Sequence, residues 1–408
     1  MTSAFRCAHP LAAALILGTV VAVLAACSNT APVAPGERVV ATRGAASERG
    51  RSAPRPAPSS NAEAVPNASS ASTIERAHAR WTGAAWSDLP GWNGDRAAEF
   101  WPAFLRSCER PAQAWLAACA DARRAGLDAM PINDAYVREW LQQRLQPYRV
   151  ESLERDPVGL ATGYFEPLIA ASRTLRPGLR VALYGPPPDL AARKPYWTRH
   201  QIETLPAAQK SVHGSEIAWV HDRLDALLLQ VQGSGRLSFV DASGRPALVR
   251  VAYAAHNDQP YKSVGRWLIE QGELRPGEAS WPAIRAWAAE HPKRVDSLLW
   301  SNPRFVFFRE EPLPDPSIGP KGAQGVPLTP GRSIAVDPQS VPYGTPVWLD
   351  TTEPLSSTPL RRLVVAQDTG SAITGAVRAD YFWGWSDGAE AQAGRMKQPL
   401  RMWVLWPR

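Results

Sequence analysis

Proline restricts the fold of this chain more than any other residue. The 408-residue sequence contains 39 prolines, about twice the usual share of ~5%. Because proline lacks an amide proton and its ring clashes with the preceding helical turn, long uninterrupted helices are disfavoured. The hydrophobic share of 45% and the charged share of 20% are ordinary for globular proteins. A helical bundle, a coiled coil and a mainly disordered chain are therefore disfavoured, and the length corresponds to roughly two or three domains.

The positive charge of the chain comes mainly from arginine. Six of the 45 basic residues are lysines, and the net charge is +7. Because arginine binds carboxylate and phosphate groups well, this charge suits an acidic polymer, an anionic membrane surface or simple solubility. No zinc-finger spacing or RNA-binding consensus is present, so we expect no nucleic-acid partner. The 17 tryptophans suit a carbohydrate-binding groove as well as a protein core.

The first 27 residues have the pattern of an exported lipoprotein. Arg6 precedes a short apolar run over residues 11–24, and small residues then lead to Cys27. A membrane-spanning helix is disfavoured, because the run is shorter than ~20 residues and no basic flank follows. The Leu-Ala-Ala-Cys sequence resembles the bacterial lipobox. We therefore predict a signal peptide over residues 1–26 and lipidation of Cys27.

Residues 27–75 are predicted to be a tether. They are rich in alanine, proline and serine and hold few large apolar side chains, so they cannot build a core. Ser28 after the lipidated cysteine follows the Gram-negative rule for outer-membrane sorting. We expect a lipid-anchored protein on the periplasmic face of the outer membrane, with its folded part held away from the lipid.

Two cysteines remain after Cys7 leaves with the signal peptide and Cys27 takes the lipid. An even pair in an oxidising compartment favours a disulfide between Cys108 and Cys119. Two buried free thiols are the alternative. A metal site is disfavoured because no histidine lies near them in the sequence.

The hydrophobic pattern changes along the mature chain. Residues 76–150 have a helical pattern, including a helix that starts at Asn133 with its apolar residues on one face. From residue 158 the pattern is mainly that of strands, and a Pro- and Gly-rich loop follows residue 312. We predict strands at 162–169, 180–184, 237–240, 248–253, 333–336, 345–349, 363–367 and 401–405, a hairpin turn at 241–244, and helices at 263–271 and 281–300.

Three aspartates near the C-terminus are the main candidates for chemistry. Asp368 ends an apolar strand, Asp380 stands directly before the aromatic residues 381–383, and Asp387 follows. A carboxylate in apolar surroundings must be paired or hydrogen-bonded, and apolar walls raise the pKa of a carboxyl toward that of a general acid. Cation binding and the capping of loops are the alternatives, although the spacing is not that of a calcium loop.

The aspartate pattern resembles a known domain. Asp368-x-Gly370-x-x-Ile373-x-Gly375, then Asp380 and Asp387, is similar to the three-aspartate domain of bacterial lytic transglycosylases. Five upstream segments resemble, in order, motifs of the membrane-bound lytic murein transglycosylase A family; they are residues 162–167, 230–235, 261–265, 302–308 and 326–329. The resemblance covers roughly residues 160–408, and residues 76–150 carry no matching motif.

The resemblance implies a mainly β fold with N-terminal helices and two domains separated by a groove. One domain would be a six-stranded double-psi β-barrel made of residues 76–164 and 320–408. The other would be a β-rich insert domain over residues 165–319.

The resemblance also implies an activity. The family cleaves the β-1,4 bond between N-acetylmuramic acid and N-acetylglucosamine in peptidoglycan, without water, and leaves a 1,6-anhydro ring. Asp380 would act first as acid and then as base, and Asp368 would support the positive charge that develops at the sugar carbon. No cofactor and no metal are expected. The partners would be glycan strands of peptidoglycan, the outer membrane and other cell-wall enzymes.

Further residues are expected to bind substrate. Hydroxyls, amides and close backbone approach are the features that would contact sugars, and the candidates are Thr162, Gly163, Tyr164, Gln230, Gln232, Gly233, Ser234, Gly235 and Asp387. A tight turn is the alternative at 162–164, and a phosphate-binding loop at 230–235 is excluded because no Lys-Ser/Thr follows. Residues 302–308 are expected to be core. His256 and Tyr261 would lie near the groove or be structural.

Two other functions stay open at this point. One is a glycoside hydrolase that uses water and two carboxylates, Asp380 with Asp368 or Glu166. The other is a lipoprotein that binds the cell wall without catalysis.

Overall fold

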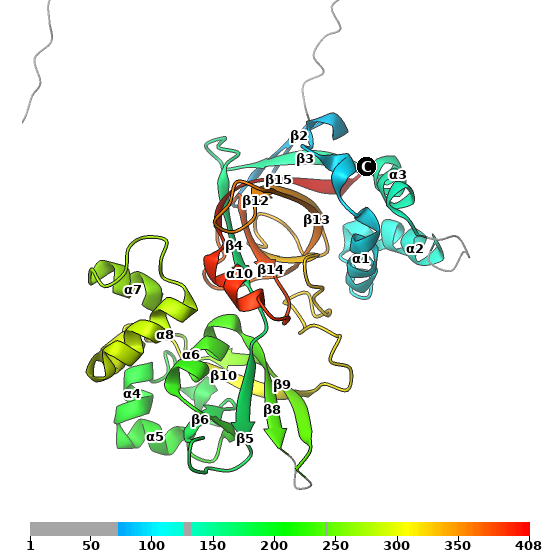
Figure 1. Cartoon of the computed structure of the whole chain (residues 1–408). Coiled ribbons are helices and arrows are strands. Elements are labelled where there is room, and N and C mark those ends of the chain that lie inside the picture. Colours follow the sequence, from blue (N-terminus) through cyan, green and yellow to red (C-terminus); the bar gives the residue numbers. More distant parts are fainter. Residues whose placement is uncertain (1–71, 126–131, 241–243) are drawn as a thin grey trace, which may run out of the picture. The chain divides into compact units, whose positions relative to one another are not determined.

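Two β-sheets organise the computed structural model, which describes residues 72–125, 132–240 and 244–408. The expected signal peptide, Cys27, nearly all of the tether and most of the predicted turn at 241–244 lie outside the described residues. The two sheets do not follow one another along the sequence. The N-terminal and C-terminal segments together form one sheet, and the middle of the chain forms the other (Figure 1).

The larger sheet closes on itself. Its order among the described residues is β1-β2-β3-β15-β12-β13-β11-β14-β4, and β15 also pairs with β4. Six strands, β4 and β11–β15, therefore form a closed ring that has no free edge, while β3, β2 and β1 extend outward from β15. The strands are β1 (Thr73–Glu75), β2 (Arg80–Gly83), β3 (Leu145–Glu151), β4 (Gly159–Tyr164), β11 (Ser333–Val336), β12 (Pro346–Thr352), β13 (Pro359–Asp368), β14 (Arg378–Phe382) and β15 (Lys397–Pro407).

Both sides of the barrel strands are covered, which explains their continuous apolar sequences. The inner side holds a core that includes Ile334, Val364 and Val404. The outer side packs against the N-terminal helices through Trp348 and Trp403. Many of the tryptophans serve this packing. One cluster buries Trp92, Trp101, Trp115, Trp140, Trp348 and Trp403.

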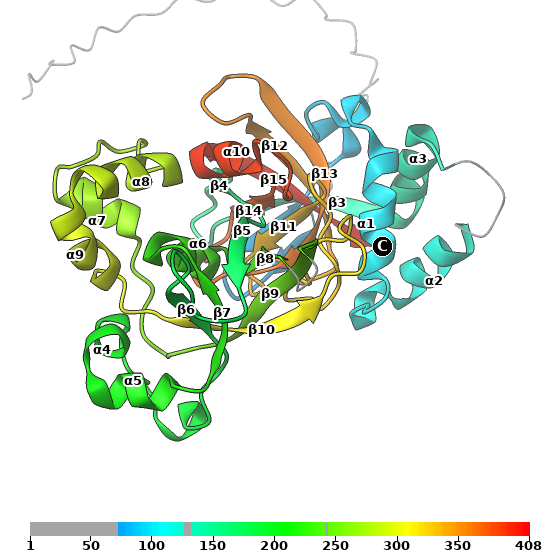
Figure 2. The ribbon, with the colours of Figure 1, turned by 60° about the horizontal axis from the view of Figure 1, so that its bottom comes forward.

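Three short helices cover the barrel (Figure 2). They are α1 (Trp101–Ser107), α2 (Leu116–Ala125) and α3 (Asp134–Arg144). The predicted start of α3 is confirmed, because the Asn133 side chain caps it by accepting a hydrogen bond of 2.9 Å from the Tyr136 amide. Cys108 and Cys119 form a disulfide that joins the end of α1 to α2.

The prediction of helical structure throughout 76–150 was wrong at both ends. Residues 80–83 form β2, and Leu145 begins β3 instead of extending α3. The physical reason is tertiary pairing: β3 forms a ladder with both β2 and β15, which overrides the local helical pattern.

The smaller sheet has the order β10-β9-β8-β5-β7-β6. Its strands are β5 (Leu168–Ser172), β6 (Val181–Tyr184), β7 (Glu216–Val220), β8 (Ser234–Val240), β9 (Pro246–His256) and β10 (Val306–Pro312). The remaining helices are α4 (Arg199–Thr204), α5 (Pro206–Val212), α6 (Arg223–Gln232), α7 (Val264–Glu270), α8 (Trp281–Glu290), α9 (Val295–Trp300) and, after β14, α10 (Ala389–Arg395).

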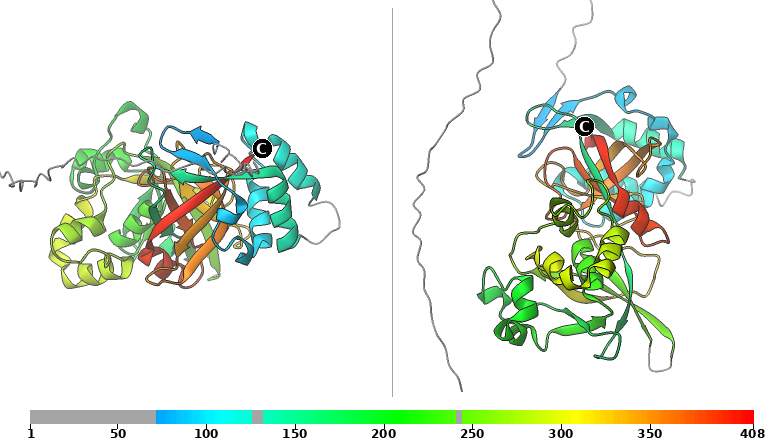
Figure 3. Two further views of the ribbon diagram at one scale, coloured as in Figure 1. Left: turned by 90° about the horizontal axis from the view of Figure 1, so that it is seen from above. Right: turned by 60° about the vertical axis from the view of Figure 1, so that its left-hand side comes forward.

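The two sheets share a hydrophobic cluster. Ala389 and Ala393 of α10 pack in the same cluster as Trp281 of α8 and Leu227 of α6, and Trp383 packs against it. Helices α6 and α8 thus lie close to α10, which is drawn in red (Figure 3). All described residues belong to one compact unit, residues 66–408.

The predicted strands and the helix at 263–271 are confirmed within a few residues, with 162–169 divided into β4 and β5. The single helix at 281–300 was wrong: the chain breaks at His291-Pro292 into α8 and α9, because proline cannot continue a helix. Helices α4, α5, α6 and α10 and strands β7, β10 and β14 were missed. Within the described residues, no helix combines the length and apolar character needed to cross a membrane.

Candidate active site

Asp380 lies on β14 at the point where this strand pairs with β4. The two strands run parallel, and Thr162 is the partner of Asp380 in their register. The Thr162 hydroxyl donates to Oδ1 of Asp380 at 2.5 Å. Arg378, two residues before Asp380 on the same strand, donates from Nη2 to Oγ1 of Thr162 at 2.8 Å. Asp380 is thus held through one of its two oxygens.

Asp368 ends β13 at the same level of the barrel. Ala335 of β11 is the register partner of both Asp368 and Asp380, so the two aspartates stand on either side of one small buried residue. The Tyr164 hydroxyl donates to Oδ2 of Asp368 at 3.0 Å, and the Ala323 amide donates to Oδ1 at 2.9 Å. Tyr164 lies on β4, and β14 and β11 stand between β4 and the strand of Asp368. The small side chain of Ala335 on β11 leaves room for the Tyr164 ring to reach Asp368.

The surroundings favour protonated carboxyls. Burial raises the pKa of Asp380 above its usual value, although the Arg378 charge and the Thr162 hydroxyl act against it. Burial raises the pKa of Asp368 to about 6, opposed by hydrogen bonds from Thr369, Ala323 and Tyr164, while the Asp380 charge adds to the increase. A carboxyl that stays protonated near neutral pH is what a general acid requires.

Tyr164 and Tyr261 also lie near the aspartate pair. Burial, followed by the charges of Asp368 and Asp380, raises the pKa of Tyr164 well above its usual value. The ring of Tyr164 packs on Phe382 with centroids 5.1 Å apart. Burial raises the pKa of Tyr261, and the Asp380 charge contributes. The Asp380 charge therefore reaches Tyr261, which precedes α7.

Gly163 has a packing role. A Cβ at this position would lie 2.6 Å from Nε1 of Trp383 and 2.9 Å from Cα of Ala393 in α10. Only glycine lets β4 approach Trp383 and α10 this closely.

The segment 230–235 forms the joint between α6 and β8. Gln230 is buried and its amide oxygen accepts a hydrogen bond from Arg199, so the structure gives it a structural partner where we predicted a sugar contact. Gly235 is equally structural, since a Cβ there would lie 2.1 Å from Cδ2 of Leu229. Gly233 ends α6 in the left-handed conformation with φ of 78°.

Gln232 and Ser234 are half-buried members of the same segment. The amide oxygen of Gln232 accepts from the Phe165 amide at 3.0 Å, which joins this segment to the end of β4. Ser234 begins β8 opposite Ala252.

Asp387 and Glu166 do not join the aspartate pair. Asp387 is exposed in the turn before α10. Glu166 is buried and accepts from Nε of Arg236 at 2.8 Å and from Nε of Arg250 at 2.5 Å. Two guanidinium groups occupy both oxygens of this carboxylate, which leaves it unsuited to act as the second carboxyl of a hydrolase.

Sequence reasoning missed Arg378 and left the place of Tyr261 open. Arg378 could have been found, because side chains two residues apart on a strand share one face. Tyr261 gives no such signal, since its approach to Asp380 depends on how the two sheets pack. His256 is structural: its Nδ1 accepts from the Asp258 amide at 2.9 Å.

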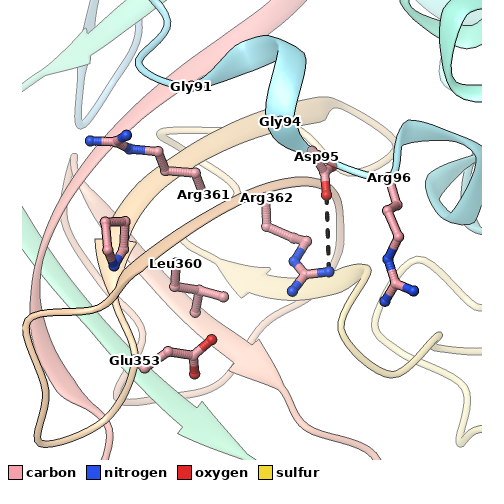
Figure 4. A pocket seen from close by; sticks show the side chains of 9 residues that line it. Gly91, Gly94, Asp95, Arg96, Glu353, Leu360, Arg361 and Arg362 are labelled. Atoms are coloured by element: carbon pink, nitrogen blue, oxygen red, sulfur yellow. Dashed lines mark ion pairs between the residues drawn. The ribbon is translucent and has the colours of Figure 1, made fainter.

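Two cavities in the described part of the chain are not lined by Asp368 or Asp380. One, of about 370 Å³, is lined by Arg96, Arg361, Arg362, Glu353 and neighbouring residues, with Arg362 3.9 Å from Asp95 (Figure 4). The other, of about 620 Å³, lies among β6, α4 and α6 of the smaller sheet. His221, Asp222 and Asp225 are grouped closely enough to hold a cation, but Arg285 already pairs with both aspartates.

Two family models match this chain. The MltA specific insert domain matches residues 160–309, and the 3D domain matches residues 332–406. Membrane-bound lytic murein transglycosylase A of Escherichia coli K12 is 34% identical over 251 residues, which are 60% of this chain and 64% of that protein. The alignment thus spans slightly less than two thirds of the curated relative.

Solved structures are also similar to this chain. The lytic transglycosylase LtgG of Burkholderia pseudomallei is 44% identical, with a TM-score of 0.57 over 83% of this chain and 99% of that chain. MltA from Neisseria gonorrhoeae is 29% identical, with a TM-score of 0.68 over 83% and 95%. E. coli MltA with bound chitohexaose is 26% identical, with a TM-score of 0.62 over 83% and 94%.

The chain has a barrel with two aspartates and a second sheet, and its two family matches cover these parts. It therefore belongs to the class of proteins that combine an MltA specific insert domain with a 3D domain. The chain belongs to the membrane-bound lytic murein transglycosylase A family. The resemblance that the sequence motifs indicated is confirmed.

Proposed function

We propose that this protein is a lytic transglycosylase that cleaves the β-1,4 bond between N-acetylmuramic acid and N-acetylglucosamine in peptidoglycan. The observation that carries the proposal is Asp380, a carboxyl with a raised pKa that is bonded through one oxygen only. The similarity to lytic transglycosylases and to E. coli MltA with bound chitohexaose supports a glycan strand as substrate.

One carboxyl is enough for this reaction. The protonated Asp380 gives its proton to the glycosidic oxygen, and the bond from this oxygen to C1 of muramic acid breaks. The C6 hydroxyl of the same sugar attacks C1 and forms the 1,6-anhydro ring, and its proton passes to the Asp380 carboxylate. The enzyme returns to its starting state without water, as a carbon–oxygen lyase (EC 4.2.2.-).

Asp368 is proposed to support the positive charge that develops at C1. It lies across Ala335 from Asp380 and is held through both oxygens, by Tyr164 and Ala323. A carboxylate fixed by hydrogen bonds is preorganised to stabilise a nearby positive charge.

A hydrolase would require a second carboxylate to act as nucleophile or to activate water. Glu166 is paired with two arginines, and Asp368 is held through both oxygens. These contacts favour the lytic reaction over the hydrolytic one.

Product analysis tests the proposal. Purified peptidoglycan treated with the protein should give muropeptides that end in 1,6-anhydromuramic acid, about 18 Da below the hydrolysed form because the C6 hydroxyl replaces water as the oriented nucleophile. Reducing ends would indicate a hydrolase, and binding without any product would indicate a wall-binding protein.

We further propose that Thr162, Gly163 and Tyr164, with Gln232, Gly233, Ser234 and Asp387, border the bound glycan in a groove. The domain division at residues 164 and 319 and the double-psi form of the barrel belong to the same proposal. The closed six-strand ring and the separate sheet of residues 168–312 support this division.

Membrane attachment through Cys27 is also proposed, on the periplasmic face of the outer membrane, with other cell-wall enzymes as partners. The lipobox-like sequence and the membrane-bound relatives support it. Cys27→Ala should move the protein into the soluble periplasmic fraction, because lipid chains hold such proteins on a membrane. A variant that still sediments with outer membranes after a salt wash would contradict this anchor.

A further inference from the structure

Arg378 and Thr162 form a chain of hydrogen bonds that ends on Asp380. Arg378 and Asp380 are two residues apart on β14, so their side chains share one face. Thr162 lies opposite Asp380 on β4. Arg378 also donates from Nη1 to the Ala379 carbonyl at 2.7 Å, which holds its guanidinium against its own strand.

The direction of these hydrogen bonds is fixed by chemistry. A guanidinium group can only donate, so Oγ1 of Thr162 accepts the bond from Arg378. The single proton of the hydroxyl then points to Oδ1 of Asp380, its one acceptor among the described residues. Because Oδ1 already accepts this proton, the acidic proton of Asp380 is left to Oδ2.

We infer that Arg378 and Thr162 are positioning residues that place the reactive proton of Asp380 on Oδ2 and set the pH range in which it is present. This inference rests on the proposed function, because it assigns the proton that the glycosidic oxygen would receive. Arg378 acts through Thr162 and need not touch the substrate, so its effect should fall on turnover rather than on binding. Thr162 also borders the proposed groove, so its role in positioning is read from the pH profile.

The sign of the pH effect follows from the titratable groups that interact electrostatically with Asp380. These are Arg378 on its own strand, Tyr164 on β4, Asp368 on β13 and Tyr261 before α7. Among them Arg378 is the cation, and the Thr162 hydroxyl favours the charged carboxylate by donating to it. Loss of either one therefore raises the pKa of Asp380. The alkaline limb of the rate profile, which reports loss of the acid proton, then moves to higher pH.

The test compares kcat, KM and the alkaline limb in four variants of the two residues and in one control variant. Arg378→Met removes the charge and the donor, and should lower kcat by roughly 10²-fold as the acid loses its orientation, leave KM nearly unchanged, and move the limb up by about one pH unit. Thr162→Val should move the limb in the same direction by less. Thr162→Ser and Arg378→Lys should keep the alkaline limb close to its wild-type pH, because each keeps the hydroxyl or the positive charge. The control Arg275→Met changes an exposed arginine outside the site and should give wild-type kcat, KM and alkaline limb.

A second readout separates this inference from the proposed function. The wild-type minus Asp380→Asn infrared difference spectrum reports the titration of the Asp380 carboxyl directly, and this titration should shift upward in Arg378→Met. Absence of 1,6-anhydro products would refute the lytic function alone. An alkaline limb and a carboxyl titration that stay in place in both Arg378→Met and Thr162→Val would overturn the positioning role.

Discussion

At the scale of single residues, the two aspartates of the site differ in how they are held. Asp380 is bonded through one oxygen, while Asp368 is bonded through both. A free carboxyl oxygen can exchange a proton with a substrate, whereas a fully bonded carboxylate acts mainly through its charge. Two acids on equivalent levels of the barrel are thus given different chemistry by their neighbours.

Asp380→Asn should abolish turnover without abolishing binding. The amide keeps the shape of the side chain but cannot donate an acidic proton, and general acid–base catalysis contributes about 10²–10⁴-fold. Release of soluble muropeptides measures the loss, and co-sedimentation with insoluble peptidoglycan measures binding. Full activity in this variant would assign the acid to another residue.

Asp368 should give the rate profile its acidic limb. Its raised pKa of about 6 means that it gains a proton as the pH falls through this value and then no longer stabilises positive charge. We expect kcat/KM to fall below about pH 6 in wild type, and this limb to disappear in Asp368→Asn. That variant should lose less activity than Asp380→Asn, and an unchanged acidic limb would remove Asp368 from the mechanism.

At the scale of elements, the disulfide joins Cys108, at the end of α1, to Cys119 within α2. Helix α1 spans seven residues and α2 spans ten, lengths at which helices are not stable alone in water. Their stability depends on the buried aromatic cluster and on the bond between Cys108 and Cys119.

Labelling of the denatured, unreduced mature protein should therefore find no free thiol at Cys108 or Cys119. Reduction should lower the free energy of unfolding by roughly 2–3 kcal/mol, the value that loop-closure entropy gives for a short loop. Denaturant titrations with and without reductant measure this difference. Labelling of both cysteines before reduction would show that the bond is absent in solution.

The sequence predicts a helix or strand best where the pattern of apolar residues fits only one kind of secondary structure. Strand β11 was found because all four of its residues are buried and read as one apolar run. Strand β14 was missed because Arg378 and Asp380 interrupt its pattern. Helix α6 was missed because its buried residues include Gln230 and nearly surround the helix, which hides the usual one-sided pattern.

The candidate site follows the same rule. Asp368 and Asp380 could be selected from their apolar and aromatic surroundings in the sequence. The pairing of Asp380 with Thr162 could not, because the register between β14 and β4 joins residues that are far apart in the chain. Gln230 and Gly235 were expected to contact sugars, but they pack inside the protein against Arg199 and Leu229. A short polar motif does not reveal such packing.

At the scale of the whole molecule, Glu166 connects the two sheets. It follows β4 directly, and the arginines that bind it belong to β8 and β9 of the smaller sheet. These arginines also donate to the carbonyls of Pro316 and Ile318, in the segment that returns toward the barrel. One buried carboxylate thus holds both passages of the chain between the sheets.

Glu166→Gln should be strongly destabilising, because it leaves two buried guanidinium groups without a matching charge. Removal of one partner from a buried ion pair costs about 3–5 kcal/mol. Glu310→Gln, which breaks the more exposed pair with Arg173, is the matched control and should cost less than about 1 kcal/mol. Equal unfolding midpoints for the two variants in urea would contradict the role of Glu166.

The position of β15 in the closed ring has a consequence for folding during synthesis. This strand follows all the other described strands in the sequence and pairs with β3, β4 and β12. Until β15 is synthesised, a growing chain presents unpaired strand edges at both β4 and β12, and such edges attract other chains. Long-range pairing of this kind also forms slowly. The protein therefore passes through a stage in which it is prone to aggregation, and a chaperone that protects exposed strands would help most before β15 has paired.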